Sequence, residues 1–442
     1  MNSLLLKLCL IPLLLQCTTV SGPRKTMPKG IVKLHGPASE DFSDLRELAN
    51  RLNTVRIVGL GESVHTSHGF YSYKFRLIRF LVKEMGFRAI GVESQWLRSE
   101  PASRYVSGGA GTLSESLSSL SPIFNDRDVA SMLEWLRAWN LNHPADKVEF
   151  FGFENGGDSF GEWKLIKDFL KNNPKEKEFL DSIDSCVGST AISESDFFGL
   201  HAFISCNRES ADRSYRFEKK DFNTCSSALD RLATAFQETA PKKVQIAVQA
   251  LKFENRSYYY WGQFLKTPSM ETLSKWFSSR DESMARTAQA INEVNNESRK
   301  MILWAHNGHI AKSNSELKIP NYNLMGMILS KEYRKSYFPI GFIAYKTGFH
   351  LIGKNYRPEF SKADDSSLES NLNQIGVEYA LLDLRNKDIE DFLQSKFGGF
   401  SLAIIPPTKI SKTPLSSFFS FVIFMQSSAP MMRQIQHHHE DL

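Results

Sequence analysis

Two residues that can do acid–base chemistry, Glu62 and His65, lie three positions apart in the segment Gly59-Leu60-Gly61-Glu62-Ser63-Val64-His65. An imidazole held by a carboxylate can take a proton from water near neutral pH, because the carboxylate stabilises the imidazolium that forms. The apolar run 55–60 before this pair is typical of a buried strand, and its glycines allow a sharp turn. We therefore expect an acid–base pair at the carboxyl end of a strand, where open parallel sheets collect catalytic groups.

Other apolar runs end in residues of the same chemical type. Glu93 and Glu154 each end a short apolar run, and His306 and His309 follow another. The carboxyl ends of parallel strands meet at one edge of a sheet, so we expect these residues to converge. Burying so many ionisable groups without a purpose would be costly in desolvation, which favours a functional interpretation. We call the expected constellation the His/Glu rim: Glu62, His65, Glu93, Glu154, His306 and His309.

The nucleophile of such a site would be water. The sequence contains no Gly-x-Ser-x-Gly nucleophile elbow, and no cysteine lies near the rim histidines in sequence. His65 is then the natural general base, with Glu62 or Glu93 as the carboxylate that holds it. His68 lies at the start of the next predicted helix, where capping or surface exposure is as reasonable as chemistry.

Basic residues and Glu154 are the candidates for substrate binding. Lys74 lies two helical turns after His65 on a face that is otherwise apolar, where the alternative is a lysine that extends its amine to solvent. Arg280 and Asp281 begin a helix predicted over 280–295. Asp281 suits the cap of that helix, and Arg280 could bind an anion or a developing oxyanion.

Alternating strand and helix patterns must position these groups. Apolar runs predict strands, and amphipathic periods predict helices between them, with Asp126 or Asp128 as a helix cap. Strands separated by helices imply parallel pairing with right-handed crossovers. The predicted strands are 55–60, 89–93, 148–153, 301–305, 339–345, 379–383 and 402–405, and the predicted helices between them are 67–85, 128–141 and 322–335.

A long helical region interrupts the sheet. Helices with charged faces are predicted at 161–172, 226–238, 242–264 and 280–295, so residues 161–298 form an insertion between two strands. The fold class is therefore α/β, with a mostly parallel central sheet flanked by helices and a large helical insertion. The apolar run 418–425 is predicted to be a buried strand, within a C-terminal strand and tail over 411–442.

The first residues and the net charge of the chain give expectations about localisation and partners. Residues 1–22 are typical of a signal peptide, and Leu14-Leu15-Gln16-Cys17 resembles a bacterial lipoprotein box that would place a lipid on Cys17. We expect an exported protein, either periplasmic or a membrane-anchored lipoprotein. Its net charge of +5 comes from scattered Lys and Arg residues, so nucleic acid is not a favoured partner.

The three cysteines after this leader all lie in the helical insertion: Cys186, Cys206 and Cys225. In an exported protein two of them can pair, although the count is odd and no metal-binding spacing is present. Three unpaired thiols are the equally weighted alternative.

Several motifs together resemble the erythromycin esterase family. They are Gly61-Glu62-Ser63-Val64-His65, Lys74-x-Arg76, Gly91-Val92-Glu93, Gly152-Phe153-Glu154, Arg280-Asp281 and Ala305-His306-Asn307-Gly308-His309. The resemblance covers residues 40–410 in matching order. It implies an α/β sheet with an inserted helical region and hydrolysis of an ester, for resistance enzymes the lactone ester of a macrolide antibiotic.

The resemblance also implies roles for individual residues. His65 matches the general base, Glu62 and Glu93 match the carboxylates of the cleft, and His306 and His309 match the pair that orients water or polarises the carbonyl. Lys74 lies where some members carry arginine, which keeps the charge but not the forked hydrogen bonding. The implied site is free of metal and needs no cofactor.

Two other functions use the same residues. In the first, two histidines and two glutamates of the rim bind zinc or another divalent ion. The ion lowers the pKa of its bound water, and the protein is a metal-dependent hydrolase. In the second, an exported protein uses the cleft to hold a ligand without turnover. The substrate itself is open, and the aromatic stretch Tyr258-Tyr259-Tyr260-Trp261 either lines an apolar cleft or packs a helix on its neighbours.

Overall fold

The computed structural model describes residues 27–155, 159–171, 222–293, 299–315, 322–350, 358–365, 367–389 and 414–434. Within these residues a single mixed sheet runs through the molecule, in the order β1-β8-β9-β6-β2-β5-β3-β4, with β7 paired to β6. The strands are β1 (Ile31–Lys33), β2 (Ile57–Leu60), β3 (Phe87–Gln95), β4 (Glu149–Glu154), β5 (Lys300–Trp304), β6 (Tyr337–His350), β7 (Pro358–Lys362), β8 (Tyr379–Asp383) and β9 (Phe421–Ser428).

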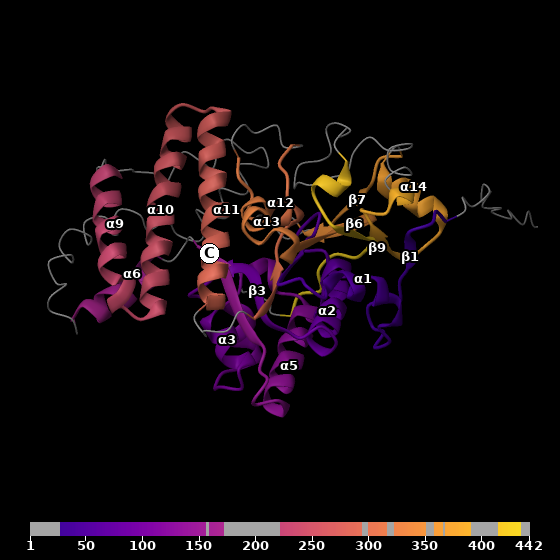
Figure 1. Cartoon of the computed structure of the whole chain (residues 1–442), viewed down its shortest axis with the longest axis horizontal. Helices are drawn as coiled ribbons and strands as arrows, with labels where there is room; N and C mark the ends of the chain where they lie inside the picture. The colour runs from indigo at the N-terminus through magenta and orange to yellow at the C-terminus, as the bar shows by residue number, and fades with distance from the viewer. Residues whose placement is uncertain are drawn as a thin grey trace, which may run out of the picture.

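Helices cover both faces of this sheet, and Figure 1 shows α1, α2 and α5 below it and α12, α13 and α14 above it. The α-helices of the described residues are α1 (Arg46–Leu52), α2 (His68–Lys83), α3 (Glu100–Val106), α4 (Leu113–Ser118), α5 (Arg127–Asn142), α6 (Ser159–Lys171), α9 (Phe222–Thr239), α10 (Lys242–Lys266), α11 (Met270–Glu293), α12 (Asn307–Ile310), α13 (Met325–Tyr333) and α14 (Leu368–Ile375). Two hydrophobic cores follow from this arrangement. Val58 and Leu60 belong to one, and Ile57 belongs to the other, because side chains alternate along a strand.

The register of the central strands places their carboxyl ends side by side. Leu60 of β2 pairs with Trp304 of β5, and Trp304 also lies opposite Val92 of β3. All three strands are parallel and buried on both faces, which suits their apolar sequences. Residues that follow these positions therefore emerge at one edge of the sheet, as predicted.

The predicted fold class is confirmed, with corrections at its margins. The strand predicted at 379–383 is present as β8, but it pairs antiparallel with both β1 and β9 instead of parallel. The strand predicted at 418–425 is present as β9, which begins at Phe421 and pairs with β6 inside the sheet. Strands β1 and β9 also extend the sheet beyond both bounds of the range 40–410. The strand predicted at 402–405 lies outside the described residues.

The helical insertion forms a separate layer at the end of the sheet near β3 and β4. Figure 1 shows α9, α10 and α11 side by side, and α10 packs on α6, α9 and α11. The aromatic stretch belongs to this layer, where Trp261 is buried and its ring lies 5.3 Å from that of Trp276 on α11. Packing between helices, the second of the two interpretations, therefore describes Trp261.

Helix α11 begins ten residues earlier than predicted. It starts at Met270, so Arg280 and Asp281 lie in its middle and Asp281 is not its cap. The physical reason is that Leu273, Trp276 and Phe277 continue the apolar period backwards, and the charged residues of the middle turns are bound by side chains from other elements.

Two further findings concern the cysteines and the membrane. Cys225 is buried and disulfide-bonded, so the alternative of three unpaired thiols is wrong, while Cys186 and Cys206 lie outside the described residues. Among the described helices, none combines the length and the apolar composition that a membrane span requires.

Candidate active site

His65 and Glu62 form the closest acid–base pair of the His/Glu rim. Both lie in the turn between β2 and α2, and His65 Nδ1 is 2.6 Å from Glu62 Oε1. The Glu62 side chain is buried and that of His65 is nearly so. The other ring nitrogen, Nε2, lies 4.0 Å from Glu93 Oε1, which is beyond hydrogen-bond distance. Glu62 therefore fixes the ring and leaves Nε2 directed into the rim.

Lys74 and Trp304 hold the second oxygen of Glu62. Lys74 Nζ donates to Oε2 at 2.5 Å, and Trp304 Nε1 donates to the same oxygen at 3.0 Å. The ammonium also lies 4.5 Å from the centre of the Trp304 ring, a cation–π contact. Lys74 is fully buried beneath Glu62. The interpretation of Lys74 as a solvent-directed lysine is wrong, because its amine contacts Glu62 in the interior. Its role in substrate binding stays a prediction.

Arg280 joins two carboxylates of the rim. Its Nη2 donates to Glu93 Oε1 at 3.0 Å, and its Nε donates to Glu154. The other oxygen of Glu93 accepts the backbone N–H of His306 at 2.9 Å. Glu93, from β3, therefore lies between His65, Arg280 and the turn after β5, at the centre of the rim.

His309 is held by Asp281, a residue that we expected to cap a helix. His309 Nδ1 lies 2.8 Å from Asp281 Oδ1, and Tyr322 donates its hydroxyl hydrogen to Asp281 Oδ2 at 2.8 Å. On the other side of the ring, Nε2 is 3.3 Å from Glu93 Oε1 and 2.9 Å from Arg280 Nη1. Both nitrogens of His309 are thus in contact with charged groups.

One tautomer of His306 makes both hydrogen bonds of its ring. Its Nδ1 accepts the backbone N–H of Gly308 at 3.0 Å, so that His306 caps α12, and Nε2–H donates to the carbonyl oxygen of Ser63 at 3.1 Å. Burial, together with the positive charges of His65 and His309, lowers the pKa of His306 to about 3. The ring is therefore neutral near pH 7, and it lies 5.2 Å from that of His65.

The charges of the site determine the protonation of the other two histidines. Burial acts to lower the pKa of His65, but the charges of Glu93 and Glu62 outweigh it and raise this pKa above 6.5. Burial acts likewise on His309, where Asp281 and Glu93 outweigh it and raise the pKa to about 10. His309 therefore carries a positive charge near pH 7.

The carboxylates at the centre stay ionised for the same reason. Burial acts to raise the pKa of Glu93, but His309, His65 and Arg280 lower it well below its ordinary value. For Glu62, burial is again outweighed, chiefly by the charge of Lys74, and its pKa is lowered. Burial lowers the pKa of Lys74 itself to about 8, against the attraction of Glu62.

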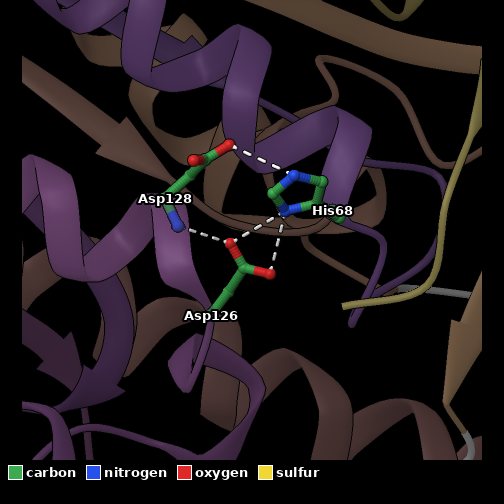
Figure 2. Close-up of side chains that lie close together, drawn as sticks. All are labelled: His68, Asp126 and Asp128. Atoms are coloured by element: carbon green, nitrogen blue, oxygen red, sulfur yellow. Dashed lines mark hydrogen bonds and ion pairs between the residues drawn. The ribbon is translucent and has the colours of Figure 1, made fainter. Parts of the chain in front are cut away.

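His68 belongs to a different cluster. Its Nδ1 lies 3.1 Å from Asp126 Oδ2, and Nε2 is 3.6 Å from Asp128 Oδ2 (Figure 2). Among the described residues this is the one group of three ligating side chains whose atoms all lie within 4.8 Å of one another. Asp126 also accepts the N–H groups of Asp128 and Met432, at 2.7 and 2.8 Å. Both oxygens of Asp126 therefore have backbone partners.

Sequence reasoning missed three residues of the site. Asp281 was noticed as a charged residue but given the wrong position in its helix, and Trp304 and Tyr322 were not selected. A tryptophan that ends the strand before His306 gave a signal, since a buried indole N–H needs an acceptor. Tyr322 gave none, because no sequence pattern connects it to α11.

Comparison with known proteins shows the family of the chain. The family model of erythromycin esterase matches residues 82–426. The chain belongs to the erythromycin esterase family. It is 24% identical over 296 residues to erythromycin esterase type II of Escherichia coli, covering 64% of this chain and 66% of that relative. It thus spans about two thirds of that enzyme, and membership of the family supports a hydrolase.

A second relative and two solved structures extend the comparison. The putative hydrolase YbfO of Bacillus subtilis is 24% identical over 350 residues, which cover 74% of each chain. A succinoglycan biosynthesis protein has a TM-score of 0.70 at 18% identity, covering 92% of this chain and 96% of that one. A mutant of the erythromycin esterase EreC, in its open conformation, has a TM-score of 0.66 at 19% identity, covering 90% and 96%. At these identities the structures show a shared fold.

Proposed function

We propose that this protein hydrolyses a carboxylic ester or macrolactone with water that His65 activates. One observation carries the proposal: Glu62 binds Nδ1 of His65, while Nε2 faces the rim without a hydrogen bond among the described residues. A base must have an accessible nitrogen, and of the three rim histidines His65 alone has one in this geometry. His306 donates and accepts through its two nitrogens, and Nε2 of His309 contacts Glu93 and Arg280.

The proposed steps balance without a covalent enzyme intermediate. Nε2 of His65 takes a proton from water as its oxygen attacks the ester carbonyl, and Glu62 and Glu93 stabilise the imidazolium. The carbonyl becomes a tetrahedral oxyanion, for which we propose the cationic Arg280 of the rim as the stabilising group. Collapse of this intermediate breaks the bond to the alcohol oxygen, and the imidazolium returns its proton to that oxygen.

A macrolide is the proposed substrate class with the most support. Two relatives from Escherichia coli are named erythromycin esterases, of type I and type II, each at 24% identity. We therefore propose macrolide inactivation as the first activity to test, with simple esters beside it.

The site argues for acid–base chemistry over metal ligation. A divalent ion at the rim would compete with Lys74 and Arg280, whose cationic groups already contact Glu62, Glu93 and Glu154. The metal-dependent hydrolase and the non-catalytic ligand-binding protein are therefore alternatives for the experiments to test.

We also propose that the protein is exported, either to the periplasm or as a lipoprotein anchored through Cys17. The leader expected in residues 1–22 supports this proposal, as does the disulfide of Cys225, because disulfides persist in oxidising compartments. Metabolic labelling with a palmitate analogue, in the wild type and in Cys17→Ser, tests the anchor. Label in neither protein would contradict lipidation.

Purified protein incubated with a panel of macrolides and simple esters tests the reaction. We expect a mass gain of one water in a macrolide product, incorporation of heavy oxygen from labelled water, and full activity after chelation. His65→Ala should lose the activity. Equal activity in both proteins would remove His65 as the base, and loss upon chelation with recovery upon zinc addition would favour the metal-dependent enzyme.

A further inference from the structure

Thr66, the residue after His65, has an unusual backbone. Its φ is +60°, in the left-handed region, which β-branched residues rarely adopt. Among the described residues that are not glycine, Arg334 is the one other with a positive φ. Strain of this kind persists where surrounding contacts impose it, and it is concentrated at functional sites.

Three separate elements hold Thr66 in this conformation. Its backbone N–H donates to the hydroxyl of Tyr71 on α2 at 2.8 Å. Its hydroxyl accepts the N–H of His350, at the end of β6, at 2.9 Å, and has the carbonyl oxygens of His65 and His350 within 2.7 Å. Its carbonyl oxygen accepts the N–H of Met431 at 2.8 Å. Every polar group of this buried residue is thus bound.

The C-terminal segment Ala429–Met432 contributes the last of these bonds and joins the turn to α5. Ala429 accepts the N–H of His68 at 2.8 Å on one side. On the other side, the N–H of Met432 donates to Asp126 Oδ2 at 2.8 Å, and its carbonyl oxygen accepts the N–H of Arg127 at 2.9 Å. The pair of His68 and Asp126 in Figure 2 closes this arrangement between α2 and α5.

We infer that Thr66 is a positioning residue, which the C-terminal segment Ala429–Met432 and Tyr71 hold in the left-handed conformation so that His65 stays on Glu62. The φ angle of Thr66 sets how the peptide between His65 and Thr66 is oriented. If Thr66 took a negative φ, the His65 imidazole would turn away from the Glu62 carboxylate. This assigns a task in the site to the segment Ala429–Met432 and to the His68 cluster. The inference rests on the proposed role of His65 as a base.

The first test compares two buried tyrosines of α2. Tyr71→Phe removes the acceptor of the Thr66 N–H, whereas Tyr73→Phe removes a hydroxyl that donates to the carbonyl oxygen of His35 at 3.0 Å. Histidine labelled with carbon-13 at Cε1 reports the pKa of His65 by NMR, with the signal assigned through His65→Gln. We expect Tyr71→Phe to bring this pKa back towards its ordinary value of about 6.5, and Tyr73→Phe to leave it in place.

The second test releases the strain directly. Glycine adopts a positive φ without steric cost, so Thr66→Gly relieves the strain while it removes the hydroxyl that contacts His65 and His350 and widens the range of backbone conformations open to the turn. Arg334→Gly makes the same backbone change at an exposed residue that precedes the opposite end of β6. We expect kcat to fall roughly 100-fold in Thr66→Gly, with little change in KM, and to be unchanged in Arg334→Gly. Thr66→Ser, which keeps the hydroxyl, should recover most of the activity.

The NMR measurement separates this inference from the proposed reaction. If the wild type hydrolyses no ester, the pKa of His65 in the variants still shows whether Thr66 positions the ring. An unchanged pKa of His65 in both Tyr71→Phe and Thr66→Gly would overturn the inference. A pKa that moves equally in Tyr73→Phe or Arg334→Gly would also overturn it, since the effect would then come from general loosening of the fold.

Discussion

Two histidines of the site, His65 and His309, are built alike and differ at one nitrogen. In each, Nδ1 lies within 2.8 Å of a carboxylate that accepts other donors too, Glu62 for His65 and Asp281 for His309. Nε2 of His309 is 3.3 Å from Glu93 Oε1 and 2.9 Å from Arg280 Nη1, whereas Nε2 of His65 is 4.0 Å from Glu93. The same construction therefore yields a fixed cation on one side of Glu93 and an available base on the other.

The difference shows that a carboxylate behind an imidazole does not by itself define a catalytic base. What decides is the environment of the far nitrogen, because a proton can be taken only where a substrate or water reaches it. Arg280, whose guanidinium reaches Glu93, Glu154 and His309, creates that asymmetry.

The largest expected effect comes from removing each imidazole in turn. His65→Ala should lower kcat by roughly 10²–10⁴-fold, the usual contribution of a general base. His309→Ala should reduce kcat less and destabilise the fold more, because Asp281 would lose a buried partner. Steady-state kinetics and denaturant unfolding measure both. The exposed His143→Ala serves as control, and equal losses of kcat in His65→Ala and His309→Ala would break the comparison.

Arg280→Met should next reduce the free energy of unfolding by about 3–5 kcal/mol, because it leaves two buried carboxylates without their cation. The matched variant is Arg286→Met on the same helix, whose ion pair with Glu332 is partly exposed and should be worth about 0–1 kcal/mol. Urea unfolding followed by circular dichroism compares the two. A similar small loss in both would mean that Arg280 is replaceable in the interior.

Replacing each carboxylate by its amide sharpens the same contrast. Glu62→Gln keeps the shape but removes the charge that stabilises the His65 imidazolium, so kcat should fall about 100-fold and the pKa of His65 should drop. Asp281→Asn should lower the pKa of His309 with a smaller change in kcat. Kinetics and histidine NMR report the two quantities separately. A larger kcat loss in Asp281→Asn would assign the base to His309 instead.

The smallest expected effect is on stability as a function of pH. The folded-state pKa of His309 is raised to about 10. Its protonation therefore contributes fully to the free energy of unfolding below pH 6.5, and this contribution is lost as the pH rises towards 10. The pKa of Lys74 is lowered to about 8, so its effect on the free energy of unfolding has the opposite sign and raises stability between pH 8 and 10.5. Between pH 6.5 and 8 we therefore expect wild-type stability to fall, because the raised pKa of His65 acts in the same direction.

Chemical unfolding at several pH values measures this slope, and His309→Gln should flatten it. Over the same range kcat/KM should rise, since the base form of His65 appears only above its raised pKa. A slope that His309→Gln leaves unchanged would mean that His309 is neutral in the folded protein.

Much of the fold was predictable because its signals are local. The apolar run 55–60, the following glycines and the amphipathic helix after it determine β2, its turn and α2, and their order determines where Glu62 and His65 emerge. The antiparallel pairing of β8 was not predictable in this way, because it depends on which strands lie next to it. The start of α11 does have a local signal in Leu273, Trp276 and Phe277, but the partners of Arg280 and Asp281 in its middle come from distant segments.

The sequence by itself determined the kind of chemistry available, because residue types and strand ends place imidazoles and carboxylates at one edge of the sheet. Only the tertiary structure decided how these groups divide their work. It placed Lys74 beneath Glu62, Arg280 between Glu93 and Glu154, and Thr66 under the C-terminal segment. The physical reason is that protonation and orientation depend on which charges and donors come within a few ångströms, and packing alone sets those distances.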